Sequence, residues 1–166
     1  RVLHGIGVLN AALWLGSTLF FSFIAGPAFF SDDMLRLLGR PHAGAAAQVV
    51  LGRYFILQEV CALIAVAHLI TEALYLGRPL YRRTLALLVA LLVLVCVGDY
   101  GFQPKLHSLH RAMYRPGTPV SMQQMAERSF RIWHGVSQVF NLLVVVGVSA
   151  YFFRVTLGPA DPRVRN

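Results

Sequence analysis

Residues 84–97 read TLALLVALLVLVCV and contain no charged side chain. The apolar run continues to Gln103-Pro104, which brings it to roughly the 20 residues that a helix needs to cross a lipid bilayer. Arg82 and Arg83 precede it, where basic side chains commonly anchor a helix at the membrane interface. The stretch therefore predicts a transmembrane helix.

Three further apolar runs flank this one, at residues 5–30, 54–76 and 130–153. The chain of 166 residues is 57% hydrophobic and 13% charged, whereas soluble domains average about 25% charged residues. We expect an all-α integral membrane bundle of four transmembrane helices with short interfacial helices in the loops. Residues 1–166 are predicted to form a single domain. The segment 104–129 is rich in polar side chains and prolines, so we place it outside the hydrocarbon, in the connection between the third and fourth spans.

The formal charge of +8 does not indicate a nucleic-acid-binding protein. The basic residues stand at the edges of the apolar runs, which is typical of membrane anchoring, and not along one face as nucleic-acid binding requires. Cys61 and Cys96 both lie inside apolar runs, where free thiols behave as small hydrophobic side chains. The expected partner of this surface is the lipid bilayer.

Ionisable side chains are costly inside a membrane, so their positions suggest where a site lies. His134, Gln138 and Asn141 repeat at helical spacing and form one polar stripe on the fourth helix. Because alternate helices run in opposite directions, acidic groups of the second and third helices fall at the same depth. The predicted polar cluster consists of His134, Gln138, Asn141, Glu59, Asp99, Arg53 and Arg131.

This cluster has two interpretations. Arg53 and Arg131 could neutralise Glu59 and Asp99, which would make it a structural network of ion pairs and hydrogen bonds between helices. Alternatively, it lines a small polar cavity that binds a substrate, an ion or a proton, with His134 as the titratable group.

A second polar group is expected nearer the other membrane face. It combines Asn10 of the first helix with His68 and Glu72 of the second, and the last two are one helical turn apart. A His68–Glu72 pair that satisfies its own hydrogen bonds is the favoured interpretation.

The six histidines of the chain raise the question of metal or haem binding. His107, His110 and Met113 follow at three-residue steps and could bind copper, although an interfacial amphipathic helix explains the same spacing. A bis-histidine haem needs two histidines at equal depth on facing helices, and His68 and His134 do not meet that condition. No catalytic motif is present, so a non-enzymatic protein is favoured and the cofactor, haem or copper if any, stays open.

Four stretches carry a family resemblance. LNAALWLGSTLFFSFIAGPAFF (9–30), LGRYF (51–55), QPK (103–105) and FRIWHGVSQVFNLL (130–143) resemble a bacterial membrane family of unknown function, domain of unknown function 4149, related to eukaryotic transmembrane protein 205. The resemblance implies a four-helix topology and a bacterial inner membrane. It marks as motif positions Trp14, Gly16, Arg53, Tyr54, Phe55, Pro104, His134, Gly135, Ser137, Asn141 and Leu142. A fainter similarity links the chain to copper-resistance D-like membrane proteins and to a haem-binding protoporphyrinogen oxidase family.

Two classes of function follow from these observations. The favoured one is a non-enzymatic bundle, either an accessory subunit of a larger membrane complex or homo-oligomer, or a bundle that binds a small ligand or ion. The alternative is a haem- or copper-binding redox protein or a transporter that uses His134 and its polar neighbours.

Overall fold

The computed structural model describes residues 2–75, 77 and 81–157, and its regular elements are all helical. Four helical stretches are long and apolar enough to cross a membrane, which confirms the expected four-helix integral membrane bundle. In chain order the elements are α1 (Val2–Phe20), η1 (Phe21–Ala25), α2 (Gly26–Ala28), α3 (Asp32–Tyr75), α4 (Arg82–Cys96), η2 (Val97–Phe102), α5 (Gln103–Tyr114) and α6 (Val120–Leu157).

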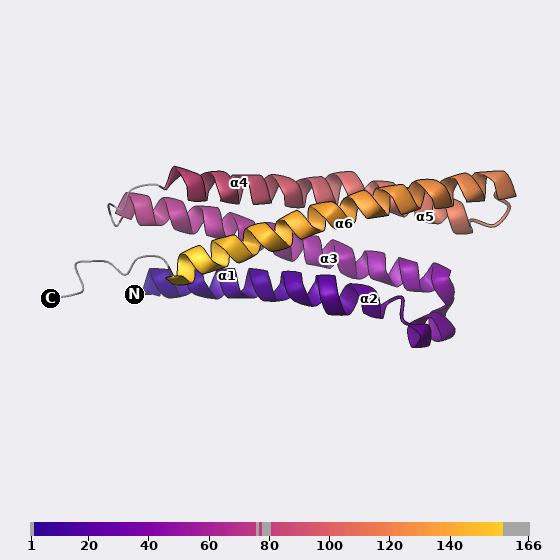
Figure 1. Cartoon of the computed structure of the whole chain (residues 1–166), viewed down its shortest axis with the longest axis horizontal. Coiled ribbons are helices and arrows are strands. Elements are labelled where there is room, and N and C mark those ends of the chain that lie inside the picture. The colour runs from indigo at the N-terminus through magenta and orange to yellow at the C-terminus, as the bar shows by residue number, and fades with distance from the viewer. Residues whose placement is uncertain (1, 76, 78–80, 158–166) are drawn as a thin grey trace.

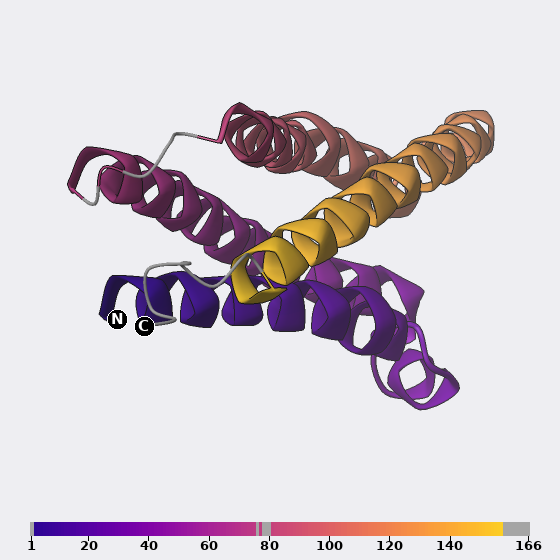
Figure 2. The same ribbon diagram turned by 60° about the vertical axis from the view of Figure 1, so that its left-hand side comes forward.

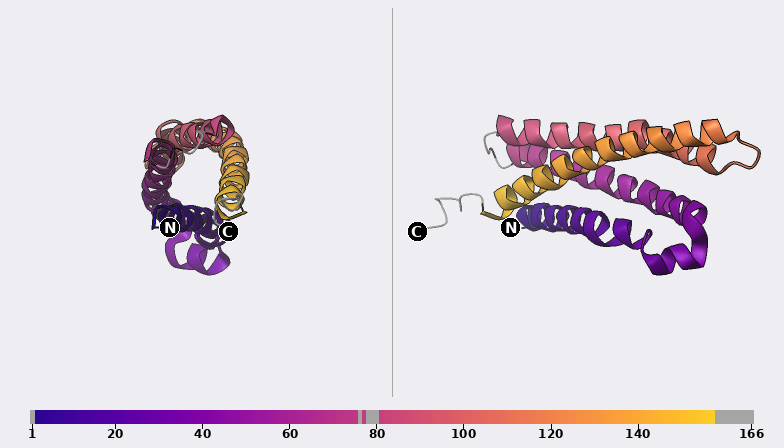
Figure 3. Two further views of the ribbon diagram at one scale, coloured as in Figure 1. Left: turned by 90° about the vertical axis from the view of Figure 1, so that its left-hand side faces the viewer. Right: turned by 45° about the vertical axis from the view of Figure 1, so that its right-hand side comes forward.

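The helices form a ring when viewed along the bundle (Figure 3, left). α1 packs against α3 and α6, and α4 packs against the same two helices from the opposite side. α6 runs obliquely, from α5 at one end of the bundle to α1 at the other (Figures 1 and 2). We call the end that holds the start of α1 and the end of α6 the terminus end. The loop end holds the α5–α6 connection.

Two segments, η1 and η2, are π-helical, and each is followed by a proline: Pro27 in α2 and Pro104 in α5. A proline within an α-helix lacks the N–H donor and its ring meets the carbonyl four residues earlier. The wider π turn moves that carbonyl away, so the helix continues through Pro104. The expected end of the third span at Pro104 was therefore wrong.

The polar segment 104–129, expected outside the hydrocarbon with an amphipathic helix at His107, His110 and Met113, is mostly helical. α5 continues to Tyr114, and α6 begins at Val120, ahead of the expected start at Phe130. At 1.5 Å rise per residue, the 38 residues of α6 extend about 57 Å, which exceeds the roughly 30 Å of hydrocarbon. The polar parts of α5 and α6 therefore stay helical where they extend beyond the apolar layer.

α3 is interrupted at Gly39, whose φ of 70° and ψ of 159° are not helical. Glycine adopts a positive φ without steric cost, and Pro41 is then tolerated in the first turn of the main segment. The part before Gly39 is a short helix set off from the bundle, at the position of the expected interfacial helix (Figure 2). The second span is longer than expected, since its helix begins well before Tyr54.

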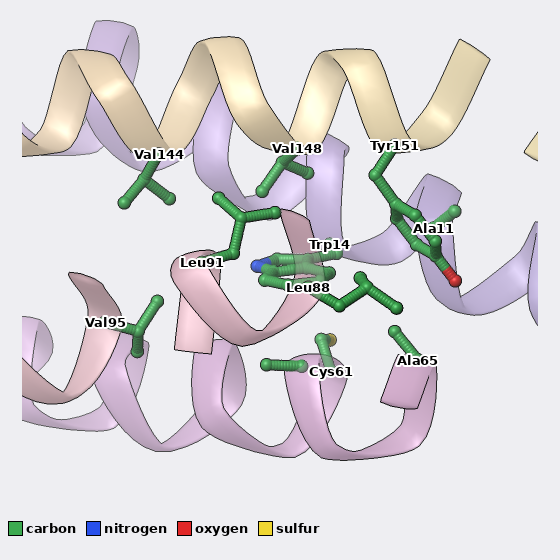
Figure 4. Close-up of a cluster of buried hydrophobic side chains, with 11 residues drawn as sticks. Ala11, Trp14, Cys61, Ala65, Leu88, Leu91, Val95, Val144, Val148 and Tyr151 are labelled. Carbon is green, nitrogen blue, oxygen red and sulfur yellow. The ribbon is translucent and has the colours of Figure 1, made fainter. Parts of the chain in front are cut away.

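The hydrophobic core fills the terminus half of the ring (Figure 4). Trp14 is fully buried among side chains from all four helices, and its ring meets that of Tyr151 edge to face at 6.0 Å. The other buried members of this core are Ala11, Cys61, Ala62, Ala65, Leu88, Leu91, Val95, Val144 and Val148.

Candidate functional site

A cavity of about 750 Å³ occupies the loop half of the ring. On α6 its wall runs from Glu127 to Val144, about 25 Å along the helix. Pockets for small molecules measure about 300–1,000 Å³, so this cavity is of ligand size. Its apolar and aromatic lining comprises Phe21, Phe29, Phe30, Leu35, Leu51, Phe55, Val95, Phe102, Leu106, Met113, Phe130, Phe140 and Val144.

A buried polar network closes the inner end of the cavity. The amide of Gln58, a lining residue that is 1% exposed, accepts a hydrogen bond from Trp14 Nε1 at 2.6 Å. Its amide nitrogen donates to Thr18 Oγ1 at 3.1 Å and approaches Ser17 Oγ at 3.4 Å. Thr18 in turn donates to the Trp14 carbonyl at 2.7 Å. These bonds fix α1 against α3 at the boundary between the core and the cavity.

Tyr54 stands one helical turn before Gln58 on the same wall. Its ring stacks on Phe21 of η1, with centroids 4.3 Å apart and planes 12° from parallel. It also contacts the ring of Phe55, with the centroids 5.8 Å apart and the planes tilted by 52°. The hydroxyl is buried next to Thr18 but makes no hydrogen bond of acceptable geometry.

The polar stripe of α6 lies on the cavity wall. His134, Gln138 and Asn141 line it together with Arg131. Asn141 Nδ2 donates to Ser22 Oγ of η1 at 2.8 Å, which joins α6 to η1 near the inner end. Towards the loop end, His134 and Gln138 line the cavity and are also exposed, so the cavity is open along this edge of α6.

The other three members of the predicted cluster lie elsewhere. Arg53 and Asp99 line a smaller groove on the outside of the ring, between α3 and the η2–α5 segment. Glu59 accepts a hydrogen bond from Tyr100 at 3.4 Å and lies 4.0 Å from the thiol of Cys96. The structure therefore separates these residues from the α6 stripe. Equal depth does not bring side chains together when they project from different sides of their helices.

The second predicted group lies largely at the α1–α3 interface of the terminus half. Asn10 donates to the carbonyl of Cys61 at 2.9 Å, and His68 Nε2 donates to the Leu3 carbonyl at 2.8 Å. The His68 ring lies directly against Gly7, where a β-carbon would come within 2.6 Å of it. Glu72 is half-buried one turn further along α3, within electrostatic range of Tyr151.

The three candidate metal ligands of α5 do not share one site. His110 and Met113 line the cavity, whereas His107 lines the outer groove. His110 packs over Gly44 of α3, and its Nε2 is buried without a hydrogen bond. Within the described parts of the chain, no three His, Cys, Asp or Glu side chains are grouped so that they could hold a metal ion.

Comparison with known proteins places the chain in a family. The family model described as a domain of unknown function, DUF4149, matches residues 9–115. The chain belongs to this family. The DUF4149 match covers the helices that supply Trp14, Tyr54 and Gln58 and ends before α6.

An uncharacterized protein of Aquifex aeolicus (strain VF5) is 30% identical to this member of the DUF4149 family over 141 residues. That alignment covers 85% of the chain and 86% of the Aquifex protein. No solved structure matches the chain.

No role was predicted for Gln58, and Tyr54 was expected only as a family-motif position. The available signal was spacing, because Tyr54 and Gln58 are four residues apart on α3, as Trp14 and Thr18 are on α1. Uncharged polar groups at this spacing indicate a shared helix face within the membrane.

Proposed function

We propose that this membrane protein binds a small, mainly apolar molecule in the cavity of its loop half. The observation that carries the proposal is a ligand-sized cavity with an aromatic lining and a few polar groups at its inner end. An empty space of this size forfeits packing contacts and lowers stability. A bound molecule that fills it would recover those contacts.

The edge of α6 offers a route for such a ligand. His134 and Gln138 are exposed and belong to the cavity wall, so a molecule dissolved in the outer part of the bilayer could enter there. We place the protein in the inner membrane of a bacterium. The accessory-subunit, homo-oligomer, transporter, and haem or copper hypotheses stay predictions, since no contact among the described residues favours them.

The test uses the neutral fluorophore N-phenyl-1-naphthylamine with the purified protein in lipid nanodiscs. Ser137→Trp adds an indole to the cavity wall from a half-buried lining position. We expect the dissociation constant of this variant for the fluorophore to rise about tenfold or more, because the indole takes up space that the fluorophore would fill and overpacking costs about 1–3 kcal/mol. Val139→Trp is the matched control, since Val139 is 59% exposed on the same helix and does not line the cavity.

Binding that is lost in Ser137→Trp and kept in Val139→Trp supports the proposal. Equal fluorescence from both variants and from empty nanodiscs would show that the dye dissolves only in lipid, and the proposal would fail. Circular dichroism and size-exclusion profiles identical to the unsubstituted protein establish that both variants are folded.

A further inference from the structure

We infer that the occupant of the cavity is a single-chain lipid with an anionic head group, which Arg40 and Arg131 bind at the loop end while the hydrocarbon chain extends to the inner end. This inference rests on the proposed function. It names the class of the ligand and the side chains that recognise its head group.

The formal charge on the cavity wall lies at its loop end. Arg40 of α3 and Arg131 of α6 are the arginines among the described lining residues, and both are exposed. Glu127, one helical turn before Arg131, lines the same end. Two guanidinium groups against one carboxylate leave a net positive charge there, so the loop end attracts an anion.

Both guanidinium groups are available to a ligand. No described carboxylate lies within 4.0 Å of either of them, that of Glu127 included. The planar donor fork of arginine matches the oxygens of a carboxylate or a phosphate group. Other arginines of the loop end, such as Arg36 and Arg128, do not line the cavity. The two that do line it come from different helices and can bind one head group together.

The inner end of the cavity suits a hydrocarbon chain and not a head group. Gln58 and Asn141 present neutral amides there, whose nitrogens donate to side chains of α1 and η1. The remaining wall is largely apolar and aromatic, as with Phe55, Phe102 and Val144. A charged head group taken to this end would lose its hydration without meeting a counter-ion, which is strongly unfavourable. The charged group of the ligand therefore stays at the loop end.

The length of the cavity matches one chain of a membrane lipid. From Arg131 to Val144 the wall follows α6 for about 20 Å. The hydrocarbon of one leaflet is about 15 Å deep, which is half of the roughly 30 Å core of a bilayer. A lipid whose head group lies at Arg131 therefore has a chain long enough to fill the cavity.

The two arginines also lie at the depth of lipid head groups. Arg131 stands at the start of the apolar run 130–153, and Arg40 lies where the main segment of α3 begins, at the loop end (Figure 1). Basic side chains at such positions lie at the boundary between hydrocarbon and water. The cavity is open along α6 at His134 and Gln138. A lipid of the adjacent leaflet can insert its chain there and keep its head group at the boundary.

The experiment compares competitors that share a hexadecyl chain: hexadecyl phosphate, hexadecanol and hexadecyltrimethylammonium. Each is tested for displacement of N-phenyl-1-naphthylamine from the unsubstituted protein in phosphatidylcholine nanodiscs. Concentrations are expressed as mole fractions of the lipid, because all three compounds dissolve in it. We expect hexadecyl phosphate to act at about five- to tenfold lower concentration than hexadecanol, and the ammonium compound to be the weakest. Inorganic phosphate, which has no chain, is expected not to displace the dye.

Substitutions test whether the two arginines hold the head group. Arg40→Gln and Arg131→Gln should each raise the required concentration of hexadecyl phosphate about two- to fivefold, and change that of hexadecanol less than twofold. Arg36→Gln and Arg128→Gln are the matched controls. Each removes the same charge three or four residues away, from a side chain that does not line the cavity. Their effect on hexadecyl phosphate is expected to be less than twofold.

Glu127→Gln is expected to have the opposite effect. It removes a negative charge from the loop end, so the required concentration of hexadecyl phosphate should fall about two- to threefold. A gain in Glu127→Gln together with a loss in Arg131→Gln follows from charge at the head-group site. A general loosening of the fold would weaken binding in both variants.

Equal potency of hexadecyl phosphate and hexadecanol overturns the inference, and so does the strongest competition from the ammonium compound or displacement by inorganic phosphate. Equal losses in Arg131→Gln and Arg128→Gln, or weaker binding in Glu127→Gln, overturn it as well. In each of these cases, dye binding that is still blocked by Ser137→Trp leaves the proposed function standing. Dye binding that Ser137→Trp does not affect removes both.

Discussion

The terminus half and the loop half of the ring are built from the same helices but are packed differently. In the terminus half, Trp14, Leu88, Leu91 and Val148 are at most 1% exposed and fill the space between the helices. In the loop half, α6 has moved away from α1 towards α5, and the space between them is a cavity lined by aromatic rings (Figure 3, right). One half is therefore close-packed, and the other holds a cavity of ligand size.

The largest expected difference between the halves is in the cost of removing a leucine. Leu88→Ala creates a void in the packed half and should lower the free energy of unfolding by about 2–5 kcal/mol. Leu51→Ala enlarges a cavity that already exists, and its cost should be about 1 kcal/mol. Unfolding in mixed micelles with increasing dodecyl sulfate measures both. Equal losses would refute the division into a packed and a hollow half.

A smaller difference in the free energy of unfolding is expected between alanine substitutions at two glycines of α6. A β-carbon at Gly147 would lie 2.7 Å from Leu91 Cδ2, so Gly147→Ala should destabilise the protein by about 1–3 kcal/mol. Gly135 has no atom within 4 Å of the same position. Gly135→Ala should therefore be neutral or stabilising by up to about 1 kcal/mol, because alanine favours a helix. The same unfolding assay compares them, and a destabilising Gly135→Ala would contradict the open packing near that residue.

The smallest expected effect concerns the hydrogen bond from Asn141 to Ser22. Interhelical hydrogen bonds in membranes contribute about 0.6 kcal/mol on average. A double-mutant cycle of Asn141→Ala and Ser22→Ala should give a coupling energy of about that size. The cycle isolates the pair from the other effects of each substitution. A coupling of zero would mean that this bond does not join α6 to η1 in the membrane.

The sequence was sufficient to predict the four spans, because long uncharged runs such as 84–97 have few alternatives to a membrane helix. The helix ends were not predictable from prolines alone. Pro104 normally signals an end, and only the π turn before it allows α5 to follow. α6 likewise begins at Val120, ahead of the apolar run from residue 130 on which its expected start rested.

The sequence predicted the depth of the site residues along their helices, but not the direction in which their side chains point. His134, Gln138 and Asn141 share one face of a single helix, so their spacing was enough to group them on the cavity wall. Glu59 and Asp99 were assigned from different helices, whose rotation about their own axes is set by packing. Packing depends on side-chain shape, as where the His68 ring fits against Gly7, and sequence spacing does not encode it.

The π segment η2 also determines the direction in which the side chains of α5 point around the helix axis. A π turn holds one residue more than an α turn, and one residue corresponds to about 100° of rotation in a 3.6-residue helix. Without the additional residue, α5 would present a different face to the ring. The orientation of His110 and Met113 towards the cavity thus depends on an insertion of a single residue in the helix before Pro104.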